Sequence, residues 1–269
     1  MLDSLLKDFK NPGSTFRGAP FWAWNAELEP EKLREQIRTM KAMGMGGFYM
    51  HSRTGLNTPY LQEKWFECIS SCIDEAEKLG MEAWLYDEDR WPSGAAGGIV
   101  TADDRFKMRK LKYCQGNAPA SGNPLARFEL ACDGNRLKNF RRLADDETPS
   151  GDFYTFYWEF MERSSWYNGE TYLDTMNPEA VQEFINVTHE EYFKRYADKF
   201  GKVVPGIFSD EPCYIHGDVL LSMPWTMKLP EEFRKSYGYD LMEYLPELFF
   251  FGIRTEEAAI SWRKFIDWR

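Results

Sequence analysis

The stretch GGFYMHSRTGLNTPYLQEKWFECISSCIDEAEKLGMEAWLYDEDRW, residues 46–91, decides the fold. It begins with a short apolar run, 46–51, and finishes with another, 81–91. Between them, apolar residues recur every three or four positions over 65–79, and Gly80 follows as a helix-stop signal. When an amphipathic helix joins two strands, the strands lie parallel in the sheet and the connection is a right-handed crossover. The stretch therefore predicts a strand–helix–strand unit.

The segment before it repeats the pattern. APFWAWN, residues 19–25, has the length and aromatic content of a short strand. Pro30 then stands at a predicted helix start, where proline is favoured. The apolar positions of this helix lie on one face: Leu33, Ile37, Met40 and Met43. Three strands and two helices with short turns indicate a parallel sheet.

The rhythm changes after the glycine-rich stretch at 94–98. Residues 111–165 contain short alternating runs such as LARFELA and FYTFYWEF, separated by Gly, Asn, Asp and Pro, which predict a small β insertion. A helical period resumes at Asn177-Pro178 and continues to Phe200. The fourth strand is expected at 203–210.

Two further helices are expected after the fourth strand, at 230–237 and 255–268. We therefore expect an α/β fold, namely the first half of a (β/α) barrel: four parallel strands with a small β-rich insertion between strands three and four. The residues after Pro212 are too few for four more units of about 30 residues each. An open doubly wound sheet is the structural alternative.

This interpretation divides the chain into three regions. The expected regions are 1–110 for the first three βα units, 111–170 for the β insertion, and 171–269 for a helix, the fourth strand and the following helices. A partial barrel has open sheet edges and an exposed apolar face. We therefore expect a homodimer, or packing against the missing half of the barrel.

Composition and charge narrow the class of partner. The chain has 33 Lys and Arg against 43 Asp and Glu, a formal net charge of −10, which disfavours nucleic acid and anionic membranes. Aromatic residues make up 16% of the chain. Such rings suit stacking against sugars, although a large aromatic core explains them equally well.

The N-terminus lacks the basic-then-apolar pattern of a signal peptide, and no stretch approaches the ~20 apolar residues that span a bilayer. The five cysteines contain no C-x-x-C pair. Reduced thiols in a cytoplasmic protein fit this pattern best.

Polar side chains gather where the predicted strands end. In chain order these residues are Trp24, Asn25, His51, Arg53, Tyr86, Asp87, Glu88, Asp89, Trp91, Asp210 and Glu211. Barrel enzymes place their active sites at the carboxyl ends of the strands, because the following loops vary while the strands hold them rigidly. The convergence therefore favours a site over chance, although some of the acids at 87–89 must point outward.

The segment GIFSDEPCY, residues 206–214, places two carboxylates between a strand and Pro212. Glycoside hydrolysis uses a pair of carboxylates, about 5 Å apart for retention and ~6.5–9.5 Å apart for inversion. We expect Glu211 as the general acid and Glu88 as the second catalytic carboxylate, unless a further strand supplies it. The other residues at the strand ends, with Trp166, are the expected substrate contacts. A solvated turn is the alternative for 206–214.

Five segments together resemble a known family. They are PFWAWNAELEPEKLREQI, MGMGGFYMHSRTGLNTPYL, EAWLYDEDRWPSGAAGG, YLDTMNPEAVQEFINVTHEEY and GIFSDEP. The resemblance as a whole runs from about Pro20 to Leu248. The segments are similar to the N-terminal catalytic-barrel region of the α-L-rhamnosidase-like proteins of glycoside hydrolase family 106. The resemblance implies cleavage of an α-L-rhamnoside or related bond, several hundred further residues, and dependence on Ca²⁺.

The S-D-E-P segment is also similar to the N-E-P that ends strand four in the largest clan of barrel glycosidases. In that clan the Glu is the acid/base, which implies the same role for Glu211. Asp210 stands where that clan has Asn.

Two other functions stay open. The chain could be a truncated barrel that binds carbohydrate without cleaving it. It could also be a divalent-metal sugar isomerase, whose ligands would be His51, Glu88, Asp89, Glu211 and His216. Only three histidines and no H-x-H motif argue against this last function.

Overall fold

A computed structural model describes residues 8–134, 136–214 and 222–252. The chain forms two compact units. The first unit consists of Met1–Val100, Ser164–Gly169 and Gln182–Pro212, and the second of Thr101–Arg163, Glu170–Val181 and Cys213–Arg269. Each unit has its own sheet.

The first unit is built on a parallel sheet. Its strands, in spatial order, are β1 (Phe21–Trp24), β2 (Gly47–Ser52), β3 (Glu82–Tyr86) and β8 (Ile207–Phe208). All three neighbouring pairs are parallel. The expected α/β fold with four parallel strands of a partial barrel is confirmed.

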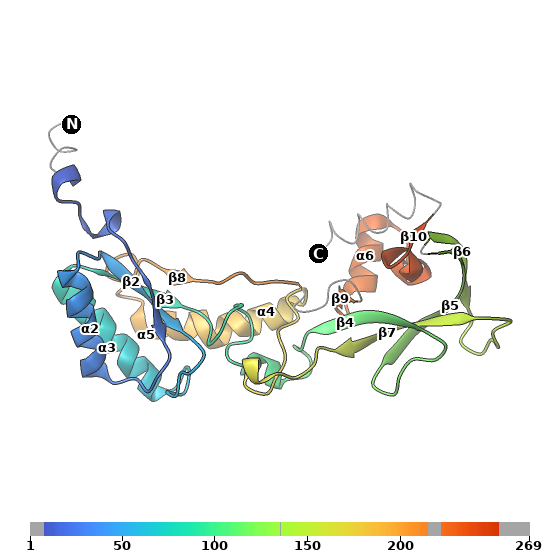
Figure 1. Ribbon diagram of the computed structural model, residues 1–269, viewed down its shortest axis with the longest axis horizontal. Coiled ribbons are helices and arrows are strands. Elements are labelled where there is room, and N and C mark those ends of the chain that lie inside the picture. Colours follow the sequence, from blue (N-terminus) through green and yellow to red (C-terminus); the bar gives the residue numbers. More distant parts are fainter. Residues whose placement is uncertain (1–7, 135, 215–221, 253–269) are drawn as a thin grey trace. The chain divides into compact units, whose positions relative to one another are not determined.

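Helices α2 (Pro30–Ala42) and α3 (Glu63–Leu79) lie side by side along one face of this sheet (Figure 1). The side chains that β1 and α3 turn toward each other pack closely, since the Trp24 and Trp65 rings are 5.1 Å apart. Helix α3 ends at Gly80, whose φ of 60° is the left-handed conformation that glycine adopts without strain.

The helix expected from Asn177 to Phe200 is interrupted. It forms α4 (Pro178–Ile185), a π-helical turn (Asn186–Glu190) and α5 (Glu191–Tyr196). The Thr188 hydroxyl donates to the Phe184 carbonyl at 2.5 Å, which is the kind of side-chain insertion that disturbs the regular helical ladder.

The other face of the first sheet is lined by rings and is strongly curled. Phe21 lies on β1 and Phe208 on β8, the two edge strands, yet their ring centroids are 5.0 Å apart. Edge strands of a flat four-stranded sheet would be separated by about 14 Å, three strand spacings. The sheet therefore has the curvature of part of a barrel.

The second unit contains a six-stranded sheet in the order β10-β6-β5-β7-β4-β9. Its strands are β4 (Arg109–Gln115), β5 (Asn123–Asp133), β6 (Arg136–Leu143), β7 (Phe153–Phe160), β9 (Met223–Trp225) and β10 (Phe251–Gly252). All neighbours are antiparallel except β10 and β6. The expected β-rich insertion between the third and fourth parallel strands is confirmed.

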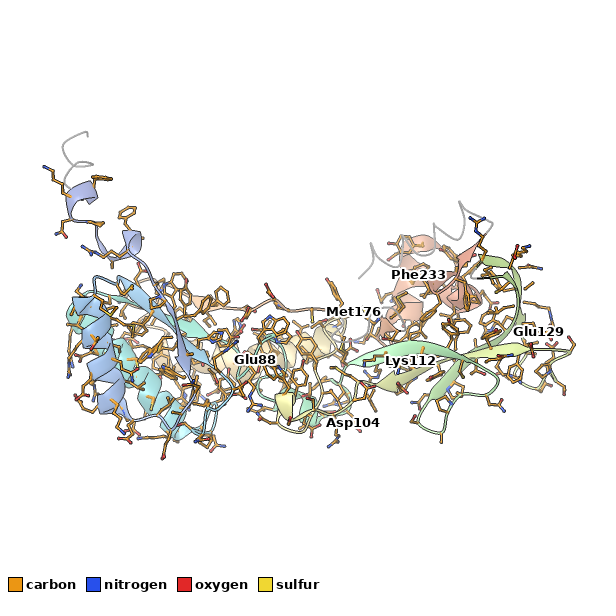
Figure 2. All side chains as sticks on the ribbon, in the orientation of Figure 1. Glu88, Asp104, Lys112, Glu129, Met176 and Phe233 are labelled. Carbon is orange, nitrogen blue, oxygen red and sulfur yellow. The ribbon has the colours of Figure 1, made fainter. Side chains whose placement is uncertain are left out.

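The helix expected at 230–237 is α6 (Leu229–Tyr237). We expected it as part of the barrel, but it packs on the six-stranded sheet. Leu229 and Phe233 are one turn apart and fully buried, and they join a core with Phe128 and Phe156 of that sheet. Phe233 is labelled on α6 in Figure 2. The helix expected at 255–268 lies outside the described residues.

Short 3-10 helices complete the described chain: η1 (Ser14–Phe16), η2 (Val100–Ala102), η3 (Ser165–Tyr167), η5 (Leu241–Glu243) and η6 (Leu245–Leu248). In the part of the chain that the structure describes, no helix has both the length and the apolar character needed to cross a membrane.

Candidate functional site

Side chains from β2, from β3 and from the residues just after β8 meet at the carboxyl end of the first sheet. The Tyr86 hydroxyl donates to Oδ2 of Asp210 at 2.9 Å. Nε2 of His51 lies 3.6 Å from the same oxygen, and the His51 and Tyr86 rings are 4.0 Å apart. We call His51, Tyr86 and Asp210 the polar rim. This convergence agrees with the expectation that polar groups at the ends of separate strands come together.

The strand register places a set of rings below the polar rim. Phe21, Tyr49 and Trp84 are paired across β1, β2 and β3, two residues before the level of His51. The Tyr49 ring is stacked on Trp84 at 5.2 Å and lies 5.0 Å from Phe21. Phe208 closes the set, 6.3 Å from Tyr86 with nearly parallel planes. We call Phe21, Tyr49, Trp84 and Phe208 the aromatic floor.

The aromatic floor borders Gly206, just before β8. A Cβ at Gly206 would lie 3.4 Å from the Trp84 ring, so the backbone there lies close to the indole. Phe21 remains 53% exposed, so the floor offers apolar ring surface beside a hydrogen-bonding rim. Sugars are recognised by this combination of ring faces and fixed polar groups.

Burial sets the proton states of the rim. His51 is only 5% exposed, and burial lowers its pKa, with a further lowering by the charge of Arg53 and an opposing effect of Asp210. Burial and the hydrogen bond to Asp210 raise the pKa of Tyr86. At neutral pH the imidazole is therefore neutral and the phenol keeps its proton, so Tyr86 is the donor to Asp210.

Glu211 presents an exposed carboxylate beside the rim. Its Oε2 accepts a hydrogen bond from the Trp91 indole nitrogen at 3.0 Å. The Trp166 indole nitrogen in turn donates to the Trp91 carbonyl at 2.6 Å. The structure thus brings Trp91, Trp166 and Glu211 together. Glu211 also has a φ of 46°, which is uncommon for a residue with a side chain.

Glu88 has a different environment. It is fully buried, and each of its oxygens accepts two backbone N–H groups: Oε1 from Asp89 and Gly97 at 2.8 and 2.6 Å, Oε2 from Gly94 and Ala96 at 2.9 and 2.8 Å. Burial raises the pKa of Glu88 to about 8, and the four donors oppose that shift. The label in Figure 2 marks its position.

These contacts change the role we assign to Glu88. A carboxylate oxygen accepts about two hydrogen bonds, so the four donors occupy both oxygens. The catalytic role expected for Glu88 does not fit this arrangement. Its carboxylate instead anchors the loop that follows β3.

Asp87 and Asp89 are also held by protein groups. Asp87 is fully buried, accepts from the Ser93 hydroxyl at 2.5 Å, and lies 2.9 Å from Nε2 of His189. Asp89, 4% exposed, accepts from Ser52 at 2.9 Å and from Asn168 at 3.0 Å. These contacts tie the loop to its neighbours, so the expected substrate contacts of Asp87 and Asp89 do not fit this structure.

The residues at the end of β1 divide in the same way. Trp24 is 2% exposed and packs on Trp65 on the helix-covered face, so a substrate contact does not fit it. Asn25 is exposed. Arg53, which directly follows β2, is exposed as well, and it lies near enough to His51 to lower the histidine pKa.

Sequence reasoning missed Ser93 and the aromatic floor. Ser93 follows Pro92 in a segment without periodicity, so no spacing signalled it. The floor did leave a signal, since Tyr49 and Trp84 stand two residues before His51 and Tyr86, on the same face of a period-two strand.

Metal ligation was tested against the same residues. Among the described residues, no three His, Cys, Asp or Glu side chains lie together in a way that could hold a metal ion. The oxygens of Glu88 and Asp89 already accept hydrogen bonds from protein groups. His216, a ligand in the isomerase hypothesis, lies outside the described residues. The described residues therefore do not fit the Ca²⁺ that the resemblance implied, and no step below uses it.

Among known proteins, a match was found to a solved structure and not to a sequence or a family model. No family model matches this chain, and no curated protein matches its sequence. A solved structure, a rhamnosidase from Novosphingobium sp. PP1Y, matches with a TM-score of 0.59 and 12% sequence identity, over 98% of this chain and 45% of that chain. The fold is rhamnosidase-like. At this identity the likeness concerns the fold alone, and this chain spans less than half the length of that rhamnosidase.

Proposed function

We propose that the first unit is part of the catalytic barrel of a glycoside hydrolase that cleaves an α-L-rhamnoside or a related bond. The observation that carries the proposal is the meeting of His51, Tyr86 and Asp210 above the aromatic floor, beside the exposed carboxylate of Glu211. The rhamnosidase-like fold supports it.

Each group has a role in this proposal. The aromatic floor contacts the C–H face of the sugar. Among the described residues, the contacts of the Asp210 carboxylate all involve Oδ2, so Oδ1 is available to a sugar hydroxyl. Glu211 protonates the glycosidic oxygen as the bond breaks.

The second carboxylate follows from the environment of Glu88. Because the four backbone donors occupy Glu88, we assign the second carboxylate to Asp210, which is the carboxylate of the polar rim. Asp210 then supplies the negative charge that stabilises the oxocarbenium-like transition state, with Tyr86 fixing its orientation.

Hydrolysis of methyl α-L-rhamnopyranoside, alongside other alkyl glycosides, tests this function, because a poor leaving group departs only when it is protonated. We expect Glu211→Gln to lower kcat/KM by about 100-fold or more, because the amide keeps the shape but cannot donate a proton to the leaving group. The control is Glu35→Gln, an exposed glutamate on α2, which should retain wild-type activity. Wild-type activity in Glu211→Gln would remove Glu211 as the acid.

A second candidate function is carbohydrate binding without cleavage. The engagement of Glu88 favours it, because one of the two expected catalytic carboxylates is unavailable. Titration calorimetry with L-rhamnose separates the two candidates. Binding without turnover of any alkyl glycoside would support the binding function, and turnover that depends on Glu211 would exclude it.

A further inference from the structure

The loop after β3 holds the end of β8 through Ser93. The Ser93 amide donates to the Asp210 carbonyl at 2.9 Å, and the Asp210 amide donates to the Ser93 hydroxyl at 2.8 Å. One serine therefore binds both backbone groups of a residue 117 positions away in the chain. Such a reciprocal pair fixes the two peptide units on either side of the Asp210 Cα.

The Ser93 hydroxyl is itself held in one orientation. It donates its proton to Oδ1 of Asp87 at 2.5 Å, and the other oxygen of Asp87 lies 2.9 Å from His189. Ser93 and Asp87 are both fully buried, so water does not compete for these bonds. With the proton directed to Asp87, the oxygen lone pairs face the Asp210 amide.

The loop that carries Ser93 is anchored on both sides. Directly after Ser93, the amides of Gly94, Ala96 and Gly97 donate to the buried carboxylate of Glu88. Two residues before it, the Trp91 indole donates to Glu211. The backbone on both sides of Ser93 is thus held in place by hydrogen bonds to Glu88 and Glu211.

The residue that follows Asp210 needs to be held in the same way. Glu211 has a left-handed φ of 46°, a conformation that costs free energy in a residue with a Cβ and persists when surrounding contacts determine it. The bonds from Ser93 to Asp210 and from Trp91 to Glu211 are contacts of this kind.

We propose that Ser93 is the positioning residue of the site. By fixing the backbone at Asp210, it directs the Asp210 carboxyl to Tyr86 and the Glu211 carboxyl to the exposed side of Trp91. The consequence for sugar rests on the proposed function, whereas the backbone contact can be measured without any ligand.

Amide hydrogen exchange of Asp210, followed by NMR, is the ligand-free measurement. Ser93→Ala removes the acceptor of that amide, and we expect its exchange to become about tenfold faster. The matched control is Ser71→Ala, a buried serine of α3 whose hydroxyl donates to the Glu67 carbonyl at 2.8 Å, which should leave Asp210 exchange unchanged. Unchanged exchange in Ser93→Ala would overturn the proposal.

Two milder variants keep the test valid if Ser93→Ala does not fold. Ser93→Cys keeps most of the volume but forms weaker hydrogen bonds, so Asp210 exchange should rise by a smaller factor than in Ser93→Ala. Ser93→Thr keeps the hydroxyl and should retain slow exchange. Fast exchange in the threonine variant, with an unchanged melting temperature, would contradict the proposal.

Sugar affinity gives the functional readout. Titration calorimetry with L-rhamnose on Ser93→Ala, Tyr86→Phe and the double variant forms a thermodynamic cycle. Both changes act through Asp210, so we expect each to weaken binding about tenfold and the double variant to lose clearly less than their product. Losses that multiply independently would show that Ser93 does not act through Asp210.

The two measurements separate the two proposals. If the wild-type chain neither binds nor cleaves any sugar while Ser93→Ala accelerates Asp210 exchange, the proposed function fails and the backbone role of Ser93 stands. If sugar binds but Asp210 exchange and the cycle show no dependence on Ser93, the proposed function stands and the positioning role fails.

Discussion

At the scale of single residues, the sequence predicts where polar side chains gather but not where each one points. The acids Asp87, Glu88 and Asp89 are the example. The sequence indicates that polar groups collect after β3, because the apolar strand pattern stops at Tyr86. It does not indicate where each carboxyl points, because beyond the last paired residue the strand period no longer holds. The direction is set by partners distant in the sequence, such as Ser52 for Asp89 and His189 for Asp87.

The burial of His51 predicts how the stability of the protein depends on pH. Burial and Arg53 lower its pKa below the ordinary 6.5, so the unfolded chain binds this proton more readily than the folded one. The contribution of His51 to stability is therefore complete above pH ~6.5 and is lost as the pH falls through its lowered pKa. We expect the melting temperature of His51→Asn to fall less between pH 7 and pH 5 than that of the wild type. Parallel curves for the two proteins would contradict this.

At the scale of elements, long periodic segments were predictable and their interruptions were not. Helices α2 and α3 lie close to their expected bounds, because both have an uninterrupted apolar face. The π-helical turn at Asn186–Glu190, where the Thr188 hydroxyl donates to the Phe184 carbonyl, has no such signal in the apolar period. Strand β8 is shorter than the expected 203–210, and Pro205, which has no N–H to donate, precedes it.

The hydrogen bonds of Glu88 predict that the loop after β3 loses stability when this side chain is changed. Glu88→Gln replaces one oxygen by an NH₂ group that faces two N–H donors, in either orientation of the amide. Because this NH₂ group cannot accept from the backbone, we expect a loss of at least about 2 kcal/mol in urea unfolding and faster exchange of the Gly94 and Ala96 amides. A change below about 0.5 kcal/mol, the scale of an ordinary surface substitution such as the control Glu35→Gln, would contradict the anchoring role.

At the scale of the whole molecule, the parallel sheet and the inserted β region were predictable, because alternating strands and helices differ in period from a run of short strands. The packing of the segment after Pro212 was not. Nothing in the period of α6 distinguishes a helix that covers a barrel from one that covers an antiparallel sheet, since both need one apolar face. The expected homodimer, or packing against further barrel strands, remains a prediction.

Because each unit has its own sheet, we predict that damage to the core of the second unit leaves the first unit folded. Phe233→Ala deletes a fully buried ring in the core of the second unit, which typically costs about 3–5 kcal/mol. We expect hydrogen exchange by mass spectrometry to show lost protection in β5 and β7, while peptides from α3 keep theirs. Equal loss in both units would show that they unfold as one.

The contact between Phe21 and Phe208 has a consequence for the groups above it. Because these two rings stand on the first and last strands of the sheet and touch, their packing is coupled to its radius of curvature. His51 and Asp210 stand at the ends of different strands, so the distance between them changes whenever that radius changes. The packing of Phe21 against Phe208 would therefore bear on how wide the carboxyl end of the sheet opens, and under the proposed function on the size of sugar that fits there.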